Sequence, residues 1–231
     1  MSPYYAPTAP TAPVHRTPWM VIIAVVVALT IVMAGVGTAL AMLGNRGSQN
    51  TPSGGIADIP SPTPGLTPSP VASPTSTQAA TGLQTNDGFS LTVPSGWIVE
   101  SKDNESMVIS DPNTQGSVSV ASGVSIPAQT AQQNKDTVDS TLRSKYPDTK
   151  ACPSSKATTS TFSGASGISW TLCFTVTGGA NSVAAAASLF AGANASGTVY
   201  YLVMVLTSQT NLQSYLNLSR PVVQSVHWKL S

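Results

Sequence analysis

Residues 88–100 read GFSLTVPSGWIVE and decide where the fold begins. The letters FSLTV alternate apolar and polar side chains, which is the period-two pattern of a half-buried strand. Pro94 ends that strand, and Gly96 can take the positive φ that a Pro-Ser-Gly turn requires. No base, metal ligand or anion cradle accompanies the turn, so a catalytic turn is not expected. We expect the first corner of a β-rich fold, with Trp97 in the core beneath the turn.

Charge is scarce along the whole chain. Charged residues make up 8% of the 231 residues, and ten Lys/Arg nearly cancel nine Asp/Glu. The usual charged fraction is about 25%. Because no basic run is present, the sequence argues against a nucleic-acid partner.

Residues 19–43, WMVIIAVVVALTIVMAGVGTALAML, form one apolar run of 25 residues without a charge. About 20 apolar residues suffice to cross a bilayer, so we expect one transmembrane helix in contact with lipid. A cleaved signal peptide is the alternative, because Ala39-Leu-Ala41 resembles a cleavage site. The run is longer than the usual signal core of about 7–15 residues, which favours an uncleaved signal-anchor. Small residues in the run could let two copies dimerise through this helix; they are Ala34, Gly35, Gly37, Ala39 and Ala41.

Two low-complexity segments flank the apolar run. Residues 1–18 carry an Ala-Pro-Thr repeat, and residues 44–86 are rich in Pro, Ser, Thr and Gly and lack aromatic residues. Neither segment can build a packed core, so we expect a disordered tail and a disordered linker that serves as a stalk. Single arginines on either side of the span leave orientation open, and His15 tilts it towards a cytoplasmic N-terminus.

Both cysteines of the chain, Cys152 and Cys173, fall in the C-terminal region. Such a pair fits a disulfide in an oxidising compartment, and two free buried thiols are the alternative. A simple hairpin around residues 163–167 would place Cys152 beyond the residue that faces Cys173. A disulfide therefore requires a bulge or a longer turn. Together with the stalk, the pair predicts a cell-membrane protein whose C-terminal domain is extracellular.

Residues 87–231 are expected to form one domain of ordinary size. Thr130-Ala-Gln-Gln133 fits a capping box for a helix that Pro147 ends. Asp139 and Arg143 are expected to pair on the wet side of that helix. Pro221 lies inside a later helical pattern and predicts a kink or a break. Strand patterns occupy the rest, including residues 155–162, 168–176 and 199–206. The Ala-rich run 183–191 is ambiguous between helix and strand, and the glycine turns on both sides favour a strand. The fold class is α+β, an antiparallel sheet with helices packed on it.

Four short motifs carry a resemblance: VPSGW at 93–97, SWT at 169–171, YYLV at 200–203 and SVHW at 225–228. In this order, residues 87–231 resemble the PsbP-like α/β/α sandwich superfamily, in the form found on exported or anchored bacterial proteins. The resemblance implies an accessory or binding role without catalysis. No site motif of that superfamily carries over to individual residues here.

The residues that could carry chemistry do not form a known set. His227 is the single histidine after residue 86, and the chain lacks a G-x-S-x-G elbow. Two cysteines and one histidine do not make a zinc set. Asp103, Glu105 and Asp111 could gather around calcium but lack the EF-hand order, so we expect solvated turns. The sequence predicts no catalytic, metal or cofactor residue.

Aromatic residues provide the remaining candidates for contact. Trp97 and Trp170 lie in alternating strand patterns and are expected in the core. Trp228 follows the last helical pattern and is the candidate exposed aromatic contact. We expect a single-pass, membrane-anchored, extracytoplasmic binding or accessory domain that is not an enzyme, with an unknown protein or small molecule as ligand. The alternatives are a cell-surface hydrolase or carbohydrate-active enzyme that uses scattered Asp and Ser residues, and a passive envelope spacer.

Overall fold

The computed structural model describes residues 81–178 and 181–231. Within these ranges, no helix has both the length and the apolar character that a membrane span requires. The predicted tail 1–18, the transmembrane helix 19–43 and most of the linker 44–86 lie outside the described residues and stay predictions.

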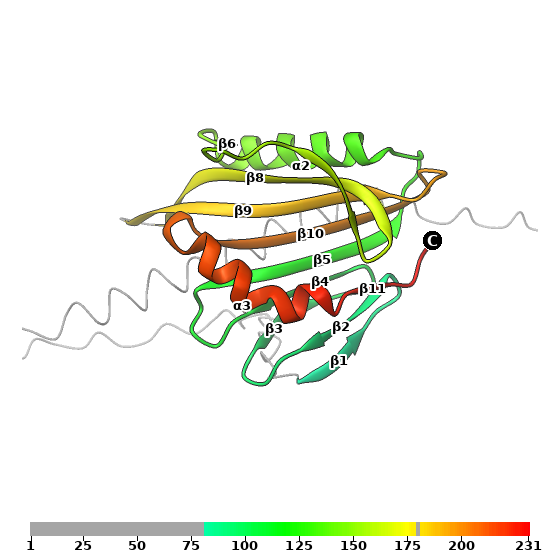
Figure 1. Ribbon diagram of the computed structural model, residues 1–231, viewed down its shortest axis with the longest axis horizontal. Helices are drawn as coiled ribbons and strands as arrows, with labels where there is room; N and C mark the ends of the chain where they lie inside the picture. The colour runs from blue at the N-terminus through cyan, green and yellow to red at the C-terminus, as the bar shows by residue number, and fades with distance from the viewer. Residues whose placement is uncertain (1–80, 179–180) are drawn as a thin grey trace, which may run out of the picture.

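Antiparallel strands build two sheets, as the α+β prediction requires (Figure 1). Eight strands form the large sheet in the order β3-β4-β5-β10-β9-β8-β6, with β7 also paired to β8, and three form the small sheet in the order β1-β2-β11. The large sheet contains β3 (Ile98–Lys102), β4 (Ser106–Ser110), β5 (Gly116–Val124), β6 (Lys150–Ala151), β7 (Thr158–Phe162), β8 (Ala165–Gly178), β9 (Asn181–Ala193) and β10 (Val199–Ser208). The small sheet contains β1 (Gly82–Thr85), β2 (Phe89–Val93) and β11 (His227–Trp228), and the helices are α2 (Ala131–Lys145), the short 3₁₀ turn η1 (Gln209–Asn211) and α3 (Leu212–Gln224).

The folded part begins earlier than the predicted boundary at residue 87. Strand β1 lies inside the stretch expected to be a disordered linker and pairs with β2. Its residues give no apolar alternation, and Leu83 is 70% exposed. Hydrogen bonds to β2 rather than burial hold this strand, and composition does not reveal such a pairing.

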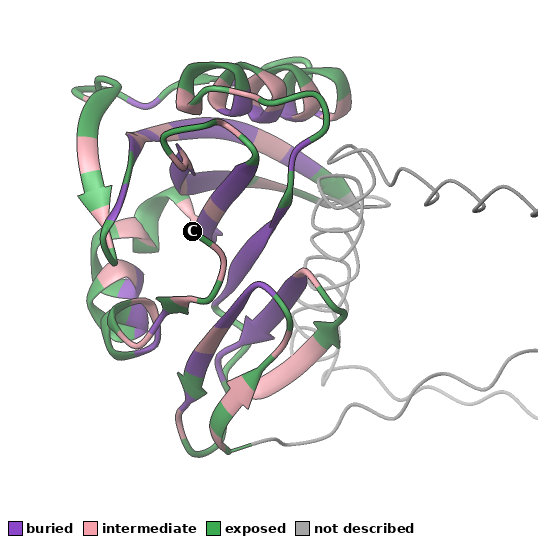
Figure 2. Cartoon of the chain, turned by 90° about the vertical axis from the view of Figure 1, so that its right-hand side faces the viewer, coloured by how far each residue is buried: buried purple, intermediate pink, exposed green. Residues whose placement is uncertain are grey.

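The two helices cover different parts of opposite faces of the large sheet. Helix α2 packs its apolar side on β8 and β9, where Leu142 lies against the core that contains Trp170 and Phe174. Helix α3 and the small sheet cover the other face, on which Tyr215 and Val222 join Phe89 and Val203. Figure 2 shows the buried residues concentrated on the strands, with exposed residues on the outer sides of the helices. This offset leaves part of the α3-side face near β8 and β9 without a helix above it.

The opening stretch forms the corner that was predicted. Gly96 adopts a φ of +84°, and the Trp97 N–H donates to the Pro94 carbonyl at 3.2 Å. Trp97 is 5% exposed and packs against Tyr215 with ring centroids 6.4 Å apart. A Pro-Ser-Gly turn thus directs the indole into the core under α3.

The Ala-rich run and the apolar run 199–206 are strands, as expected. β10 lies between β5 and β9 and is covered on both faces, which explains why it lacks alternation. Helix α3 is continuous through Pro221, so the predicted break does not occur. Pro221 lies in the last turn of α3, and the helix ends three residues later at Gln224.

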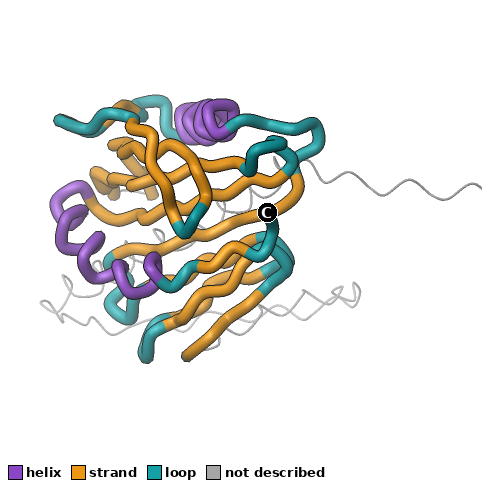
Figure 3. The backbone as a smooth tube through the Cα atoms, turned by 45° about the vertical axis from the view of Figure 1, so that its right-hand side comes forward, coloured by secondary structure: helices purple, strands orange, loops and turns teal. Residues whose placement is uncertain are grey.

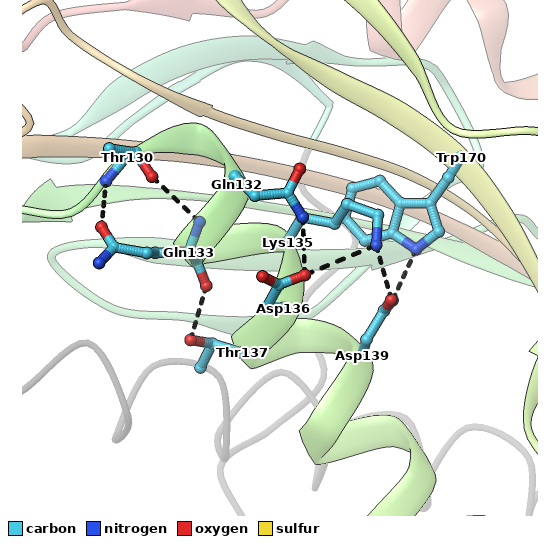
Figure 4. Close-up of polar contacts among 8 residues, drawn as sticks. All are labelled: Thr130, Gln132, Gln133, Lys135, Asp136, Thr137, Asp139 and Trp170. Atoms are coloured by element: carbon cyan, nitrogen blue, oxygen red, sulfur yellow. Dashed lines mark hydrogen bonds and ion pairs between the residues drawn. The ribbon is translucent and has the colours of Figure 1, made fainter.

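Helix α2 begins where its capping box predicts. The Thr130 hydroxyl accepts from the Gln133 N–H at 3.2 Å, and the Gln133 side chain accepts from the Thr130 N–H at 2.8 Å (Figure 4). The expected Asp139–Arg143 pair is not formed. Asp139 faces the sheet instead and accepts from Lys135 Nζ and from Trp170 Nε1, each at 2.8 Å. The indole and the ammonium of Lys135 hold the carboxylate on the sheet side, because both are desolvated there and require a partner.

Replacing Asp139 by alanine should lower the free energy of unfolding by about 1–3 kcal/mol, because the Trp170 N–H and Lys135 lose their shared acceptor. The Asp139 side chain is only 15% exposed, so water replaces it poorly. Urea unfolding followed by circular dichroism measures the change. Asp136→Ala is the matched control, since that side chain is 60% exposed and its loss should stay within about 0.5 kcal/mol. Equal losses in the two variants would contradict the role given to Asp139.

Candidate functional site

One side of α3 does not pack on the core. Tyr215, Ser219 and Val222 are the buried residues of the helix and face the sheet. A second stripe runs at helical spacing beside them and consists of Gln213, Leu216, Asn217, Arg220, Val223 and Gln224. In this stripe the two apolar side chains are half-buried and the four polar ones are exposed.

This stripe forms one wall of a hollow of about 400 Å³. Phe190, Val203 and Val205 lie in its floor, and Phe162 and Ser169 line its far side. A second hollow of about 470 Å³ is lined by Thr158, Thr171 and Leu212. The two hollows adjoin, because Ser169 and Thr171 lie on one face of β8 and Leu212 precedes Gln213 in α3. We call the combined hollow between α3 and β7 the α3 groove.

The opposite wall of the groove is the β7–β8 hairpin. It turns through Ser163 and Gly164, whose φ values of +46° and +85° suit a tight two-residue turn. Phe162 pairs with Ala165, so β8 starts earlier than the predicted turn over residues 163–167 allows. Figure 3 shows this hairpin standing forward of the sheet, with β7 as the leg that faces α3.

The disulfide lies at one end of the α3 groove. Cys152 and Cys173 are bonded, with Cα atoms 5.0 Å apart, as one of the two sequence alternatives predicts. Ala151 pairs with Leu172, and Thr158 pairs with Ser169. Between these two pairs the chain from β6 to β7 advances by seven residues, whereas β8 advances by only three. The longer turn that the disulfide was expected to require is therefore present. It separates β6 from β7 and forms the outer rim of the groove.

Aromatic side chains close the other end. The predicted contact residue Trp228 is half-buried and donates its Nε1–H to the Phe162 carbonyl at 3.1 Å. Its ring lies 5.0 Å from that of Tyr201 and 5.9 Å from that of Phe162, measured between centroids. Trp228 thereby supports Phe162, and through it the wall of the groove.

The remaining sequence candidates lie elsewhere. His227 is exposed in β11, where it pairs with Ser90. Asp103 and Glu105 precede β4, whereas Asp111 follows it, so the structure separates the three acids that calcium would have needed. Among the described residues, no three His, Cys, Asp or Glu side chains lie close enough to hold a metal ion.

The acids before and after β4 serve the backbone and one tyrosine. Asp111 is fully buried, which corrects the expectation of a solvated turn, and accepts from the N–H groups of Asn113 and Gly116 at 2.9 Å each. These donors compensate for burial of the carboxylate. Glu105 accepts from the Tyr200 hydroxyl at 3.2 Å, and burial together with this carboxylate raises the pKa of Tyr200.

Two other hollows fit a ligand less well. A cavity of about 30 Å³ between α2 and the sheet is far below the roughly 300 Å³ of a ligand pocket. A wider cleft of about 770 Å³ is lined by turn residues such as Gly164, Asn194 and Gly197 together with strand residues. The α3 groove is preferred because one wall is a helix stripe and its floor is apolar strand residues, and sites built on helices and strands hold a ligand more precisely than sites on turns.

Sequence reasoning missed this groove. The spacing of the α3 stripe was readable, because Gln213, Asn217, Arg220 and Gln224 recur every three or four residues. The far wall could not be predicted from the sequence, because it depends on the angle between the β7–β8 hairpin and the rest of the sheet.

No family model matches the chain, and no curated protein matches it. Among solved structures, the chain is similar to a crystal structure from Bacteroides thetaiotaomicron, with 12% identity over 62% of this chain and 46% of that one and a TM-score of 0.37. It thus spans less than half of that protein. It is also similar to the solution structure of cyanobacterial PsbP from Synechocystis, with 17% identity, 68% and 98% coverage and a TM-score of 0.41. A third is LpqN, involved in cell envelope biogenesis of Mycobacterium tuberculosis, with 12% identity, 61% and 82% coverage and a TM-score of 0.32. Membership of the PsbP-like superfamily stays a prediction.

Proposed function

We propose that this chain is a membrane-anchored binding protein, whose folded domain lies outside the membrane and holds a partner in the α3 groove. The observation that carries the proposal is the groove itself. It is walled by a helix and a strand, floored by apolar side chains and rimmed by amide and hydroxyl groups. Such a mixture of apolar floor and convergent polar groups is typical of binding sites.

Location outside the membrane is supported by two features of the chain. The 25-residue apolar run 19–43 is long enough to span a bilayer, and a Pro/Ser/Thr-rich linker separates it from the domain. The Cys152–Cys173 disulfide fits an oxidising compartment better than the cytosol.

Binding rather than catalysis is supported by the use of the acidic side chains. Asp103 and Asp111 accept from backbone N–H groups in turns, and Asp139 holds Trp170 and Lys135. The groove lining offers amides, hydroxyls and cations, which orient a ligand but are not paired as acid and base.

Labelling of intact cells tests the location. The full chain carries Leu83→Cys, a 70% exposed position of β1, and the cells receive a maleimide that cannot cross membranes. We expect labelling without lysis. Ser2→Cys in the tail is the matched control and should react only after lysis. Labelling of the Leu83 variant only after lysis would place the domain inside and overturn the proposal.

A further inference from the structure

We propose that the α3 groove takes an extended acidic peptide from another protein, and that this peptide adds as a strand to the free edge of β7. The inference rests on the proposed function and names the class of partner. It depends on three properties of the groove, which are the backbone groups of β7, the spacing of its side chains and its charge.

β7 leaves backbone groups unused on the edge that faces away from β8. In an antiparallel pair, residues that exchange hydrogen bonds alternate with residues whose N–H and C=O point away. Phe162 and Ala165 close the two-residue turn as a bonded pair, so Thr161 and Thr159 point their backbone groups away from β8. No other described residue bonds to these four groups. They are a template for an added strand.

The two edges of the large sheet differ in how readily they could pair with an added strand. At the far edge, β3 has an irregular register between Val99 and Ser101 and carries Glu100 and Lys102, devices that discourage strand addition. The β7 sequence TTSTF has no charge, no proline and four residues of high strand propensity. This edge is left suitable for pairing.

Side chains of an added strand would meet the groove on alternate positions. Successive residues of a strand point to opposite faces, so every second one would face the floor formed by Phe190 and Val205. Leu216 and Val223 of α3 are half-buried and would cover these side chains from the other wall. Addition of an extended peptide to an exposed sheet edge is a recurring mode of peptide recognition.

The charge of the groove selects the kind of peptide. Among the described residues that line it, the charged side chains are Lys156 at the disulfide end and Arg220 in α3. Arg220 donates to the Asn217 amide oxygen at 2.9 Å, which leaves its other N–H groups available to a carboxylate. A peptide with Asp or Glu residues, or with its own terminal carboxylate, complements this charge.

A selection with random peptides tests the inference on the full chain in lipid nanodiscs. We expect a displayed nine-residue library to enrich peptides that contain Asp or Glu, alternate apolar residues and lack central proline. The synthetic peptide should bind with micromolar affinity, and its binding should weaken with added salt. No enrichment above empty nanodiscs would overturn the inference, as would enriched peptides that are basic.

Variants of β7 and α3 locate the site. Thr161→Pro removes an N–H that faces away from β8, so the ladder to β8 stays intact while peptide affinity should fall at least tenfold. Thr161→Val keeps the backbone donor and should change affinity less than twofold. Arg220→Gln should weaken acidic peptides about threefold to tenfold and flatten their salt dependence. Unchanged affinity of both the Thr161→Pro and Arg220→Gln variants would place the peptide elsewhere and overturn the inference.

The peptide itself gives an independent readout that does not depend on how the variants fold. Methylation of one backbone nitrogen at a time should abolish binding at every second position, because only alternate N–H groups face β7. Loss without this alternation, or pairing of two copies through β7 seen by light scattering, would contradict a peptide strand. If no peptide binds while the Leu83→Cys variant is labelled on intact cells, the peptide inference fails and the proposed location stands.

Discussion

Trp97→Ala is expected to lower the free energy of unfolding by about 3–5 kcal/mol, the range for removing a buried Trp side chain. The indole is 5% exposed and contacts Tyr215 of α3, in the core that also contains Phe89 and Val222. The corner formed by residues 94–97 would lose the side chain that fixes it to α3. Because the remaining atoms are held by the sheet, the cavity could collapse only in part.

Urea unfolding of the full chain in detergent, followed by far-ultraviolet circular dichroism, measures this loss. Trp97→Phe should cost less, because an aromatic ring still meets Tyr215. Leu218→Ala is the surface control, since Leu218 is 45% exposed and its truncation should stay within about 0.5 kcal/mol. A Trp97→Ala protein with the parental urea midpoint would show that the indole does not anchor the corner.

Much of the fold was predictable because its signals are local. The alternation in β2, the Pro-Ser-Gly turn and the Thr130 capping box each depend on fewer than eight consecutive residues. Each of them was found where the pattern indicated. Trp97 was placed correctly for the same reason, since a turn of known type fixes the direction of the next side chain.

Errors occurred where a distant partner decides the outcome. Asp139 was assigned to Arg143 on its own helix, but the Trp170 indole, 31 residues away, and Lys135 hold it on the sheet side. Strand β1 was assigned to the linker because only its pairing with β2 orders it. Asp111 was expected in solvent, and here the donors are local, since they are the N–H groups of Asn113 and Gly116. What the sequence did not reveal is the tertiary packing that buries this turn.

The α3 groove belongs to the same class of long-range features. Its walls come from residues near 160 and near 220, and the sheet between them sets their separation. The sequence did indicate its two ends, since Cys152–Cys173 and Trp228 had been selected for other reasons. Their positions in the structure give both a role in holding β7 opposite α3.

Removing the disulfide should have the second large effect. The double variant Cys152→Ala/Cys173→Ala opens a loop of 21 residues in sequence separation. Opening such a loop gives conformational entropy back to the unfolded chain, which lowers the free energy of unfolding by about 3 kcal/mol. The same bond holds the turn between β6 and β7, so its removal should also loosen one end of the groove.

Two measurements separate the global effect from the local one. Urea midpoints of the double variant and of the parent give the change in stability, and the parent treated with reductant should reproduce the midpoint of the variant.

Hydrogen exchange under native conditions gives the local effect. The Cys152 N–H, which donates to the Thr171 carbonyl at 3.2 Å, should lose protection, whereas α2 amides such as Leu142 should change no more than the global stability does. An unchanged midpoint would show that strand pairing alone fixes β6. Loss of protection spread evenly over α2 and β6 would show that the bond does not act locally on the groove. The expected combination, a lower midpoint with exchange concentrated beside β6, would make the disulfide the element that keeps β7 in place for a partner.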